Sequence, residues 1–599
     1  MSEFQTLSDV WRVFDATDKK GFSFFDVSAA IDSIPKDSIE TDACRYESMA
    51  FGFSENCGDK VWGAYYGPQW TFEKADTGEL VYMPDIKDVS REMISYWESR
   101  AAVVVNPLLK MRYTGLVMEL KKRVTNEEPD YKTIKLANVQ ALITVVENDY
   151  CEYATTTLDY VERALFLAIG FRNKDLQKQA VKAFYDAHKR LSKDDLSPGI
   201  WGRIFQSLIK YRKAFSEYEE ELLQEQLDRF KRLKNLAITE GGKTDRYVHV
   251  LSDQVYLLAD YYHAIGSIEK AEPFFEVLLK AIKASIPVRG GLWGQGMIQQ
   301  MQSRLRKYGF DKRANQLYVD LRNLAELSLA DLKPIEVSIP FDSEKVNAYL
   351  DKALQGSAED ALRFFVVQYL PKLDEEKRLL KDKAGKSPLL DMSPTVTIDS
   401  SGNVMSNVGV GPEAEHQKLY FSMYENMRVA IPFIHLHITK MKETGKMTVE
   451  SMMDLFKDSP LIAEDRKEIV RRGFEAYMSE DYLVSCHLLI PQLENAIRLL
   501  FAINGDNVMR AQKDPADGNE YLSLDSLLSS DNATKYMGED MTNYYRNVLT
   551  DQNGWNIRNL VSHGLLTATS FDYGMADRII HAFMLLSFFK PTSSSTEAV

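Results

Sequence analysis

Cysteine is scarce in this chain, and the few cysteines present show no ordered spacing. The 599 residues include four, namely Cys44, Cys57, Cys151 and Cys486. None belongs to a pair with the short spacing of a zinc site, and four in so long a chain do not make a disulfide framework. We therefore expect no metal ion and no structural disulfide.

Long apolar runs are missing as well. The stretch 582–589 is among the longest and is interrupted by Ser587, whereas a helix needs roughly 20 apolar residues to cross a bilayer. The first twenty residues contain four Asp or Glu and no continuous apolar core, so they lack the pattern of a secretory signal. We expect a cytoplasmic protein that does not contact a membrane.

Positive charge is the third shortage. Lys and Arg number 73 against 87 Asp and Glu, which gives a net charge of −14. Because non-specific binding of nucleic acid depends mainly on Lys and Arg at phosphates, a surface that binds RNA everywhere is excluded. The glycine patterns of a P-loop and of a dinucleotide-binding turn are also absent. Any RNA contact must be local, and we expect no cofactor.

The rest of the composition is typical of a large folded protein. Hydrophobic residues make up 45% and charged residues 27% of the chain, an ordinary globular profile that excludes wholesale disorder. The chain is too long for a single hydrophobic core. We predict a mainly α protein in four parts, which are residues 1–106, 107–340, 341–416 and 417–599.

Residues 1–106 predict a small mixed α/β domain. Two aromatic, β-favouring runs within 65–84 flank the turn residues 75–78, which is a hairpin pattern. From Ile86 the periodicity becomes helical, and Asn106 followed by proline predicts a break.

Residues 107–340 predict an irregular helical-repeat array. Gly266 is followed five residues later by Ala271, and 43 residues further on Gly309 is followed five residues later by Ala314. A small residue early in a second helix lets that helix pack closely on the first, as in helical repeat proteins. Two copies predict an irregular array, since they are too few to define a regular solenoid.

The last two parts are also mainly helical. Residues 341–416 predict linker helices with an inserted β-hairpin or ordered loop that turns at 400–402. Residues 417–599 predict a helical domain that contains a compact bundle at 480–590. The bundle helices are expected at 483–501, up to about 549, around 558–563 and at 573–589.

The segment W-N-I-R-N-L-V-S-H, residues 555–563, carries the residue types best suited to a chemical reaction. It places Arg558, Asn559 and His563 on an otherwise apolar helix. Histidine titrates near neutral pH, and arginine carries a permanent planar charge that fits a phosphate. Such a pair suits phosphodiester cleavage, because one group can move a proton at the 2′-hydroxyl or the leaving oxygen while the other stabilises the transition state.

Helix geometry bears on how these residues would act. At about 100° per residue, positions five apart differ by about 140°, so Arg558 and His563 lie on different faces while Asn559 and His563 share one. Two copies of the helix meeting across a two-fold axis would bring two Arg and two His around one phosphate. We therefore expect a homodimer formed through the C-terminal bundle. The apolar residues expected to face the bundle are Trp555, Leu560, Val561 and Leu565.

A structural interpretation of the same segment stays open. In this alternative His563, which precedes Gly564, is a capping or core histidine, and Arg558 is paired to a surface carboxylate. Two further histidines, His435 and His437, lack the spacing of a helical metal pair and are interpreted as core or surface residues.

The residues 480–599 resemble the HEPN (higher eukaryotes and prokaryotes nucleotide-binding) superfamily, whose catalytic members carry an R-N-x-x-x-H-like motif late in a helical bundle. The whole chain is similar to a bacterial family with such a C-terminal domain. The motifs that carry the likeness are Y-Y-G-P, E-M-I-S-Y-W-E-S-R-A, N-P-L-L-K-M-R-Y, H-L-L-I-P-Q-L-E-N and R-N-L-V-S-H-G. The resemblance implies a dimeric, metal-independent endoribonuclease that leaves a cyclic phosphate, often in phage defence or as a toxin.

The charge of this region is unusual for a nuclease. Residues 480–599 hold 8 Lys and Arg against 15 Asp and Glu, so RNA is repelled at long range. A phosphate can still bind if the basic residues gather near the motif, and these are Arg498, Arg510, Lys513, Arg546 and Arg558. Glu494, four residues before Arg498, is a possible supporting residue because HEPN bundles often hold an acidic residue on their first helix; an ordinary helix ion pair is the alternative. Ser562 is a further possible support.

The sequence therefore predicts a regulated endoribonuclease with RNA as its substrate. In this interpretation the helical array binds a regulatory protein or a phage-derived trigger. One alternative is a non-catalytic scaffold whose HEPN-like bundle only dimerises. Another is a nucleotide-binding regulator in which Arg558 holds a phosphate without cleaving it.

Overall fold

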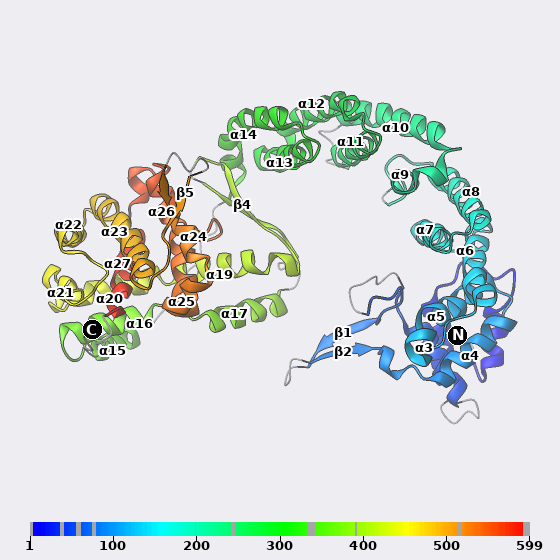
Figure 1. Ribbon diagram of the computed structural model, residues 1–599, viewed down its shortest axis with the longest axis horizontal. Coiled ribbons are helices and arrows are strands. Elements are labelled where there is room, and N and C mark those ends of the chain that lie inside the picture. The colour runs from blue at the N-terminus through cyan, green and yellow to red at the C-terminus, as the bar shows by residue number, and fades with distance from the viewer. Residues whose placement is uncertain are drawn as a thin grey trace. The chain divides into compact units, whose positions relative to one another are not determined.

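We describe the protein from a computed structural model of the full chain (Figure 1). The structure describes residues 4–35, 41–55, 62–74, 79–197, 199–240, 246–333, 342–387, 389, 392–399, 401–512 and 518–590. The chain forms two compact units, Met1–Tyr318 and Val319–Val599. Each unit is described by itself.

The predicted fold class is confirmed. The structure is 71% helical and 4% strand, and the strands of the described segments pair as two-stranded hairpins. The four sequence-based parts stay a prediction. The two units group residues 1–106 with most of 107–340, and residues 341–416 with 417–599.

Unit 1 begins with five helices and one hairpin. The bounds are α1 Leu7–Phe14, α2 Phe24–Asp32, α3 Thr41–Gly52, β1 Trp70–Glu73, β2 Leu80–Met83, α4 Arg91–Val103 and α5 Pro107–Thr125. The hairpin expected within 65–84 is present, with Trp70 opposite Met83, while its turn residues 75–78 lie outside the described residues. Asn106 accepts a hydrogen bond from the Leu108 backbone as the N-cap of α5, so the predicted break starts a new helix.

The helices on either side of Asn106 share one core. The buried Arg112 of α5 donates to the backbone carbonyls of Ala50 and Phe53 at 2.8 and 2.6 Å. Tyr113 donates to Glu47 at 2.6 Å. Residues 1–106 therefore pack directly against the first helix that follows them.

Antiparallel helices make up the rest of unit 1 (Figure 1). Their bounds are α6 Ala137–Glu147, α7 Ala154–Gly170, α8 Lys174–Leu191, α9 Arg203–Lys210, α10 Glu219–Glu240, α11 Arg246–Ala264, α12 Glu272–Arg289, α13 Gly291–Lys307 and α14 Asp311–Asp331. α14 crosses the boundary between the units. The two predicted glycine turns lie between α11 and α12 and between α13 and α14, with Gly266 at φ 69° and Gly309 at φ 80°. Ala271 and Ala314 are fully buried, as expected for close helix pairing.

Unit 2 is a helical bundle with two small hairpins. Its helices are α15 Ser343–Ala353, α16 Ala358–Gln368, α17 Leu373–Lys386, α19 Glu415–Val429, α20 Ile431–Glu443, α21 Val449–Asp454, α22 Lys467–Met478, α23 Tyr482–Ile503, α24 Leu524–Leu528, α25 Asp531–Leu549, α26 Ile557–Ser562 and α27 Tyr573–Leu585. The strands are β3 Thr395–Ile398, β4 Val404–Val408, β5 Met509–Ala511 and β6 Asn519–Tyr521. The β3–β4 hairpin lies where the sequence predicts it, although residue 400 of its turn lies outside the described residues. The β5–β6 hairpin was not predicted.

Helices α23 and α27 form the centre of the bundle. Ile490, Leu493 and Ile497 of α23 and Ile580 and Phe583 of α27 are 0–1% exposed. Among the described helices, α23 is the one with the length and mean hydropathy of a membrane span, 1.2 over its most apolar window. Half of that window is buried inside the bundle, as in the core helix of a folded domain.

Candidate functional site

The motif segment forms a short helix held at its start by a close backbone contact. Trp555 donates its backbone N–H to the Asn547 carbonyl at 2.8 Å. A Cβ added to Gly554 would lie 2.2 Å from the same carbonyl, so only glycine fits there. Asn556 adopts a left-handed conformation with φ 51°, and α26 then runs from Ile557 to Ser562.

The apolar face of α26 differs from the expected one. Ile557 is its buried anchor at 1% exposure, whereas Leu565 is 55% exposed. Trp555 and Val561 are partly buried against the core, and Leu560 is half-buried. The expectation for Leu565 is wrong because the helix ends at Ser562, before Leu565 can continue its apolar face.

Arg558 is bound by a carboxylate from α23. Its Nε lies 2.7 Å from Glu494 Oε2 and its Nη2 lies 3.2 Å from Oε1. Arg498 donates to the same Oε1 at 2.7 Å and to the Leu522 carbonyl at 3.3 Å. The side chains of Glu494, Arg498 and Arg558 are 15%, 18% and 25% exposed. The structure thus brings three of the predicted site residues into one cluster with a net positive charge.

The cluster contains the two ordinary ion pairs that the sequence left open as alternatives to a catalytic role. Glu494 and Arg498 form the i,i+4 ion pair, and Arg558 is paired to a carboxylate. Burial raises the pKa of Glu494, but the hydrogen bonds and charges of Arg558 and Arg498 outweigh burial and lower it below its usual value. Glu494 is therefore an ionised acceptor that holds both guanidinium groups in place.

Asn559 lies in a hydrogen-bonded position beside Arg558. Its Oδ1 accepts from Arg558 Nη1 at 3.0 Å. Its Nδ2 donates to Asn556 Oδ1 at 2.8 Å and to the Thr550 carbonyl at 3.3 Å. Asn559 therefore accepts from Nη1, the guanidinium nitrogen of Arg558 that does not donate to Glu494.

His563 lies at the other end of α26. It is the C-cap residue, its backbone N–H donates to the Asn559 carbonyl at 3.0 Å, and Gly564 follows with φ 63°. The side chains of Ser562 and His563 are exposed, and within the described ranges the His563 ring makes no hydrogen bond. Arg558 is turned toward α23 and His563 toward solvent, so one chain does not bring the two together.

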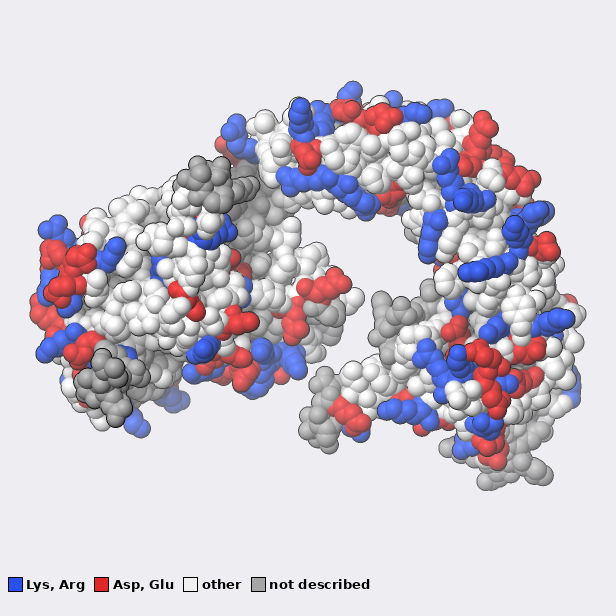
Figure 2. Space-filling model, in the orientation of Figure 1, with Lys and Arg blue, Asp and Glu red and all other residues white. Residues whose placement is uncertain are grey.

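The other basic residues of this region have separate roles. Arg510 pairs with Glu520 at 2.7 Å across the β5–β6 hairpin, and Arg546 lies over the ring of Tyr420 at 5.4 Å. Lys513 lies outside the described residues. Figure 2 shows Lys and Arg interspersed with Asp and Glu over the drawn face of unit 2. A local contact at Arg558 therefore has more support than a broad basic surface.

Two histidines of unit 2 are buried in an uncharged state. Burial lowers the pKa of His437 to about 4, and neither of its ring nitrogens has a hydrogen-bond partner among the described residues. Burial, aided by the charge of Arg578, lowers the pKa of His581 to about 3. His581 contacts the Tyr544 hydroxyl at 2.7 Å and the Val366 carbonyl at 3.0 Å. These are core histidines, as expected for His437.

His435 is a partly exposed histidine with a buried acidic partner. Its Nδ1 lies 2.9 Å from Oδ2 of Asp577 on α27, and Tyr477 of α22 donates to Oδ1 at 2.5 Å. Burial raises the pKa of Asp577, and the two hydrogen bonds oppose that rise. This cluster could not be predicted from the sequence, because its members come from three helices far apart along the chain.

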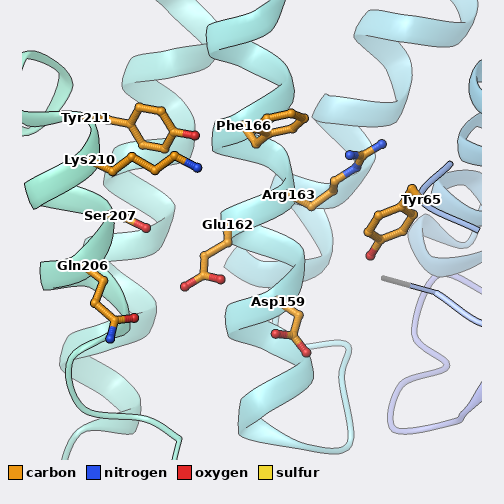
Figure 3. Close-up of a pocket in the computed structure, with 9 residues that line it drawn as sticks. All are labelled: Tyr65, Asp159, Glu162, Arg163, Phe166, Gln206, Ser207, Lys210 and Tyr211. Carbon is orange, nitrogen blue, oxygen red and sulfur yellow. The ribbon is translucent and has the colours of Figure 1, made fainter. Parts of the chain in front are cut away.

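Unit 1 contains a cleft between α7 and α9 with a volume of about 400 Å³ (Figure 3). Asp159, Glu162, Arg163 and Phe166 come from α7, Gln206, Ser207 and Lys210 from α9, and Tyr211 and Tyr65 complete the lining. Arg203 joins the two helices, with bonds of 2.6 Å to Asp159 and 2.7 Å to Glu162. Arg163 is paired with Glu119 and lies 4.2 Å from the ring of Tyr65. The cleft thus combines aromatic rings with ordered charges.

Known proteins add no assignment to these sites. No family model, curated protein or solved structure matches the chain. Within the described ranges, no three or more His, Cys, Asp or Glu side chains are grouped as metal ligands.

Proposed function

We propose that unit 2 is a metal-independent endoribonuclease of the HEPN type, with its active site at α26. The observation that carries the proposal is the composition of this helix, which holds an ordered arginine, an asparagine beside it and an exposed histidine within six positions. Arg558 and Asn559 bind the scissile phosphate, and His563 transfers the proton. Ser562, Glu494 and Arg498 act as supporting residues.

The reaction needs one proton to be removed and one to be supplied. The RNA 2′-oxygen loses its proton and forms a bond to phosphorus, while the bond from phosphorus to the 5′-oxygen breaks and that oxygen gains a proton. The products are a 2′,3′-cyclic phosphate and a 5′-hydroxyl. Histidine serves either proton step near neutral pH, and the Arg558 charge stabilises the additional negative charge on the phosphate.

The contacts of α26 support a site that is completed by a second copy. The Arg558 guanidinium points to Glu494, while His563 is exposed at the opposite end of the helix. A two-fold axis next to α26 would place His563 of one copy near Arg558 of the other. We include homodimerisation through the C-terminal bundle in the proposal.

Glu494 supports a regulated rather than a constantly active enzyme. Its carboxylate occupies two N–H positions of Arg558 that a phosphate would use, so RNA must compete with an internal anion. We propose that a regulatory protein or a phage-derived trigger acts through the helical array of unit 1. A cytoplasmic location and a role in phage defence or toxicity complete the proposal.

The test compares RNA cleavage by the wild type and by variants, with excess chelator present. His563→Ala and Arg558→Ala should each lower the rate by about 100-fold or more. His487→Ala is the matched control, because His487 is also an exposed histidine of this bundle, and its hydrogen bond to the Leu483 carbonyl and its ring contact with Phe571 do not involve α26. Equal cleavage by His563→Ala and His487→Ala would remove His563 from the mechanism, and 5′-phosphate products would exclude the proposed chemistry.

A second candidate function is binding without cleavage. The cleft between α7 and α9 favours it, because a concave surface with aromatic and charged side chains is typical of helical arrays that bind another protein. In this case the biological effect would survive His563→Ala and be lost when the cleft is filled by Ser207→Trp. A nucleotide-binding regulator would instead show tight nucleotide binding without turnover and would lose that binding in Arg558→Ala.

A further inference from the structure

The α7 wall of the cleft between α7 and α9 has charges that are already paired within the protein. Arg203 donates to Asp159 at 2.6 Å and to Glu162 at 2.7 Å, and Arg163 is paired with Glu119. Two carboxylates and the one guanidinium of Arg203 leave a charge of −1 on this side. The acceptors of the α7 wall are therefore largely occupied.

The α9 wall instead presents donors without an internal partner. Lys210 is exposed, and its ammonium group lies 5.0 Å from the centre of the Tyr211 ring. Among the described residues Lys210 forms no ion pair, and the side chains of Gln206, Ser207 and Tyr211 make no hydrogen bond. In Figure 3 the Lys210 amino group and the Ser207 and Tyr211 hydroxyls point toward α7. This wall thus offers a positive charge and neighbouring O–H donors to a bound group.

Phe166 adds an apolar contact to the same end of the cleft. Its side chain is 52% exposed and lies on the α7 side, opposite Lys210 and Tyr211 (Figure 3). An exposed aromatic ring gains most when a second ring or an aliphatic group covers it. The complementary group is a carboxylate for Lys210 with an apolar side chain beside it for Phe166.

The exposure of the rim favours a protein segment over a small molecule. Gln206, Lys210 and Phe166 are all exposed, so a ligand in the cleft stays in contact with solvent. A small molecule is normally held by burying most of its surface. A side chain of a protein segment can bind in an open cleft, because the rest of the segment contacts the helical array beside it.

We propose that the cleft between α7 and α9 binds a protein segment in which an acidic residue is next to an aromatic one. The carboxylate pairs with Lys210 and accepts a hydrogen bond from Ser207 or Tyr211, while the aromatic ring packs on Phe166. The charge of −1 that remains at Asp159 and Glu162 disfavours a second acidic residue at that end. This inference rests on the binding function proposed for the cleft and is independent of RNA cleavage.

The test is a fluorescence-anisotropy titration of labelled peptides with the full chain. The probe is the peptide Gly-Ser-Glu-Phe-Ser-Gly with blocked ends, and its two controls carry Gln in place of Glu or Ala in place of Phe. We expect saturable binding of the probe, weakened about fivefold by Gln and about threefold or more by Ala. The difference between the Glu and Gln peptides should shrink at high salt, because salt screens an exposed ion pair.

Variants of the cleft identify which side chain reads which part of the peptide. Lys210→Met should bind the Glu and Gln peptides equally, and Phe166→Ala should bind the Phe and Ala peptides equally. Both side chains are exposed, so neither change disturbs the core. Ser207→Trp fills the cleft and should abolish binding. Lys213→Met is the matched control, because Lys213 is an exposed lysine just after α9 that lies outside the cleft lining, and its affinity should equal that of the wild type.

Three results would overturn the proposal. They are no saturable binding of the probe to the wild type, equal affinity of the wild type for the Glu and Gln peptides, and undiminished binding by Ser207→Trp. A fourth arm uses 3-phenylpropanoate, which carries a carboxylate and a ring in one small molecule. Saturable binding of this acid without binding of the probe peptide would assign the cleft to a free carboxylic acid and refute the protein segment. The cleavage assays at Arg558 and His563 are separate, so failure here leaves the proposed ribonuclease activity intact.

Discussion

Removing the three members of the Arg558 cluster one at a time should destabilise unit 2 to different and ordered degrees. Glu494 accepts three hydrogen bonds, two from Arg558 and one from Arg498. Each is charge-assisted but only partly buried, so each contributes about 1 kcal/mol after solvent screening. Glu494→Ala loses all three bonds and leaves two unpaired arginines, for a cost of about 3 kcal/mol.

The arginine variants should cost less because Glu494 keeps a partner. Arg558→Ala loses its two bonds to Glu494 and its bond to Asn559 and should cost about 2 kcal/mol, while Arg498→Ala loses one bond to Glu494 and a long one to the Leu522 carbonyl and should cost about 1 kcal/mol. The measurement is the free energy of unfolding of the full chain in denaturant, with the transition of unit 2 followed separately because two units need not unfold together. Equal costs for Arg498→Ala and Glu494→Ala would refute the assignment of Glu494 as the shared acceptor.

The Arg558 cluster also predicts how the stability of unit 2 changes with pH. The pKa of Glu494 in the folded protein is lowered from its usual value of 4.5, so the unfolded chain binds more protons below that value. The stability that Glu494 contributes is fully present above about pH 4.5 and is lost as the pH falls through the folded pKa. Glu494→Gln should reduce the decrease in the free energy of unfolding as the pH falls below about 4.5. An unchanged acid slope would show that this carboxylate is not specifically stabilised in its ionised form.

Three further predictions test the packing of unit 2. Gly473→Ala should destabilise the protein by about 1–3 kcal/mol, since the added Cβ would lie 2.6 Å from Leu489. Gly385→Ala is the control, because its Cβ would meet no atom within 4 Å, and it should stabilise the protein by about 0.5–1 kcal/mol. A similar shift in Tm for both variants would contradict the close contact at Gly473. His437→Leu should make the protein more resistant to acid. In the wild type, burial lowers the folded pKa of His437 to about 4, so between pH 6.5 and about pH 4 the unfolded chain binds a proton that the folded chain does not, and stability falls. The variant should lack this fall, which the midpoint of acid unfolding measures. Gly554→Ala should displace α26 and lower both Tm and RNA cleavage, and full activity at normal stability would show that the close contact before the helix is not required.

The sequence by itself determined the elements whose cause is local. Helical periodicity predicts where α23 and α27 lie, Asn106 followed by proline predicts the break before α5, and the glycines at 266 and 309 predict two turns. The β3–β4 hairpin follows from β-favouring residues around a glycine turn. The choice of Arg558, Asn559 and His563 also came from the sequence, because it depends on residue chemistry within one short segment.

Tertiary structure alone decided what surrounds those residues. Glu494 lies 64 positions before Arg558 in the chain, and periodicity carries no information on which face of α23 meets α26. The start of α26 depends on tertiary contacts, the burial of Ile557 and the close approach of Gly554 to the Asn547 carbonyl. The buried charge of Arg578 is invisible in the sequence for the same reason. Its neighbours Met427, Tyr544 and Trp555 come from distant parts of the chain, and only folding brings them together.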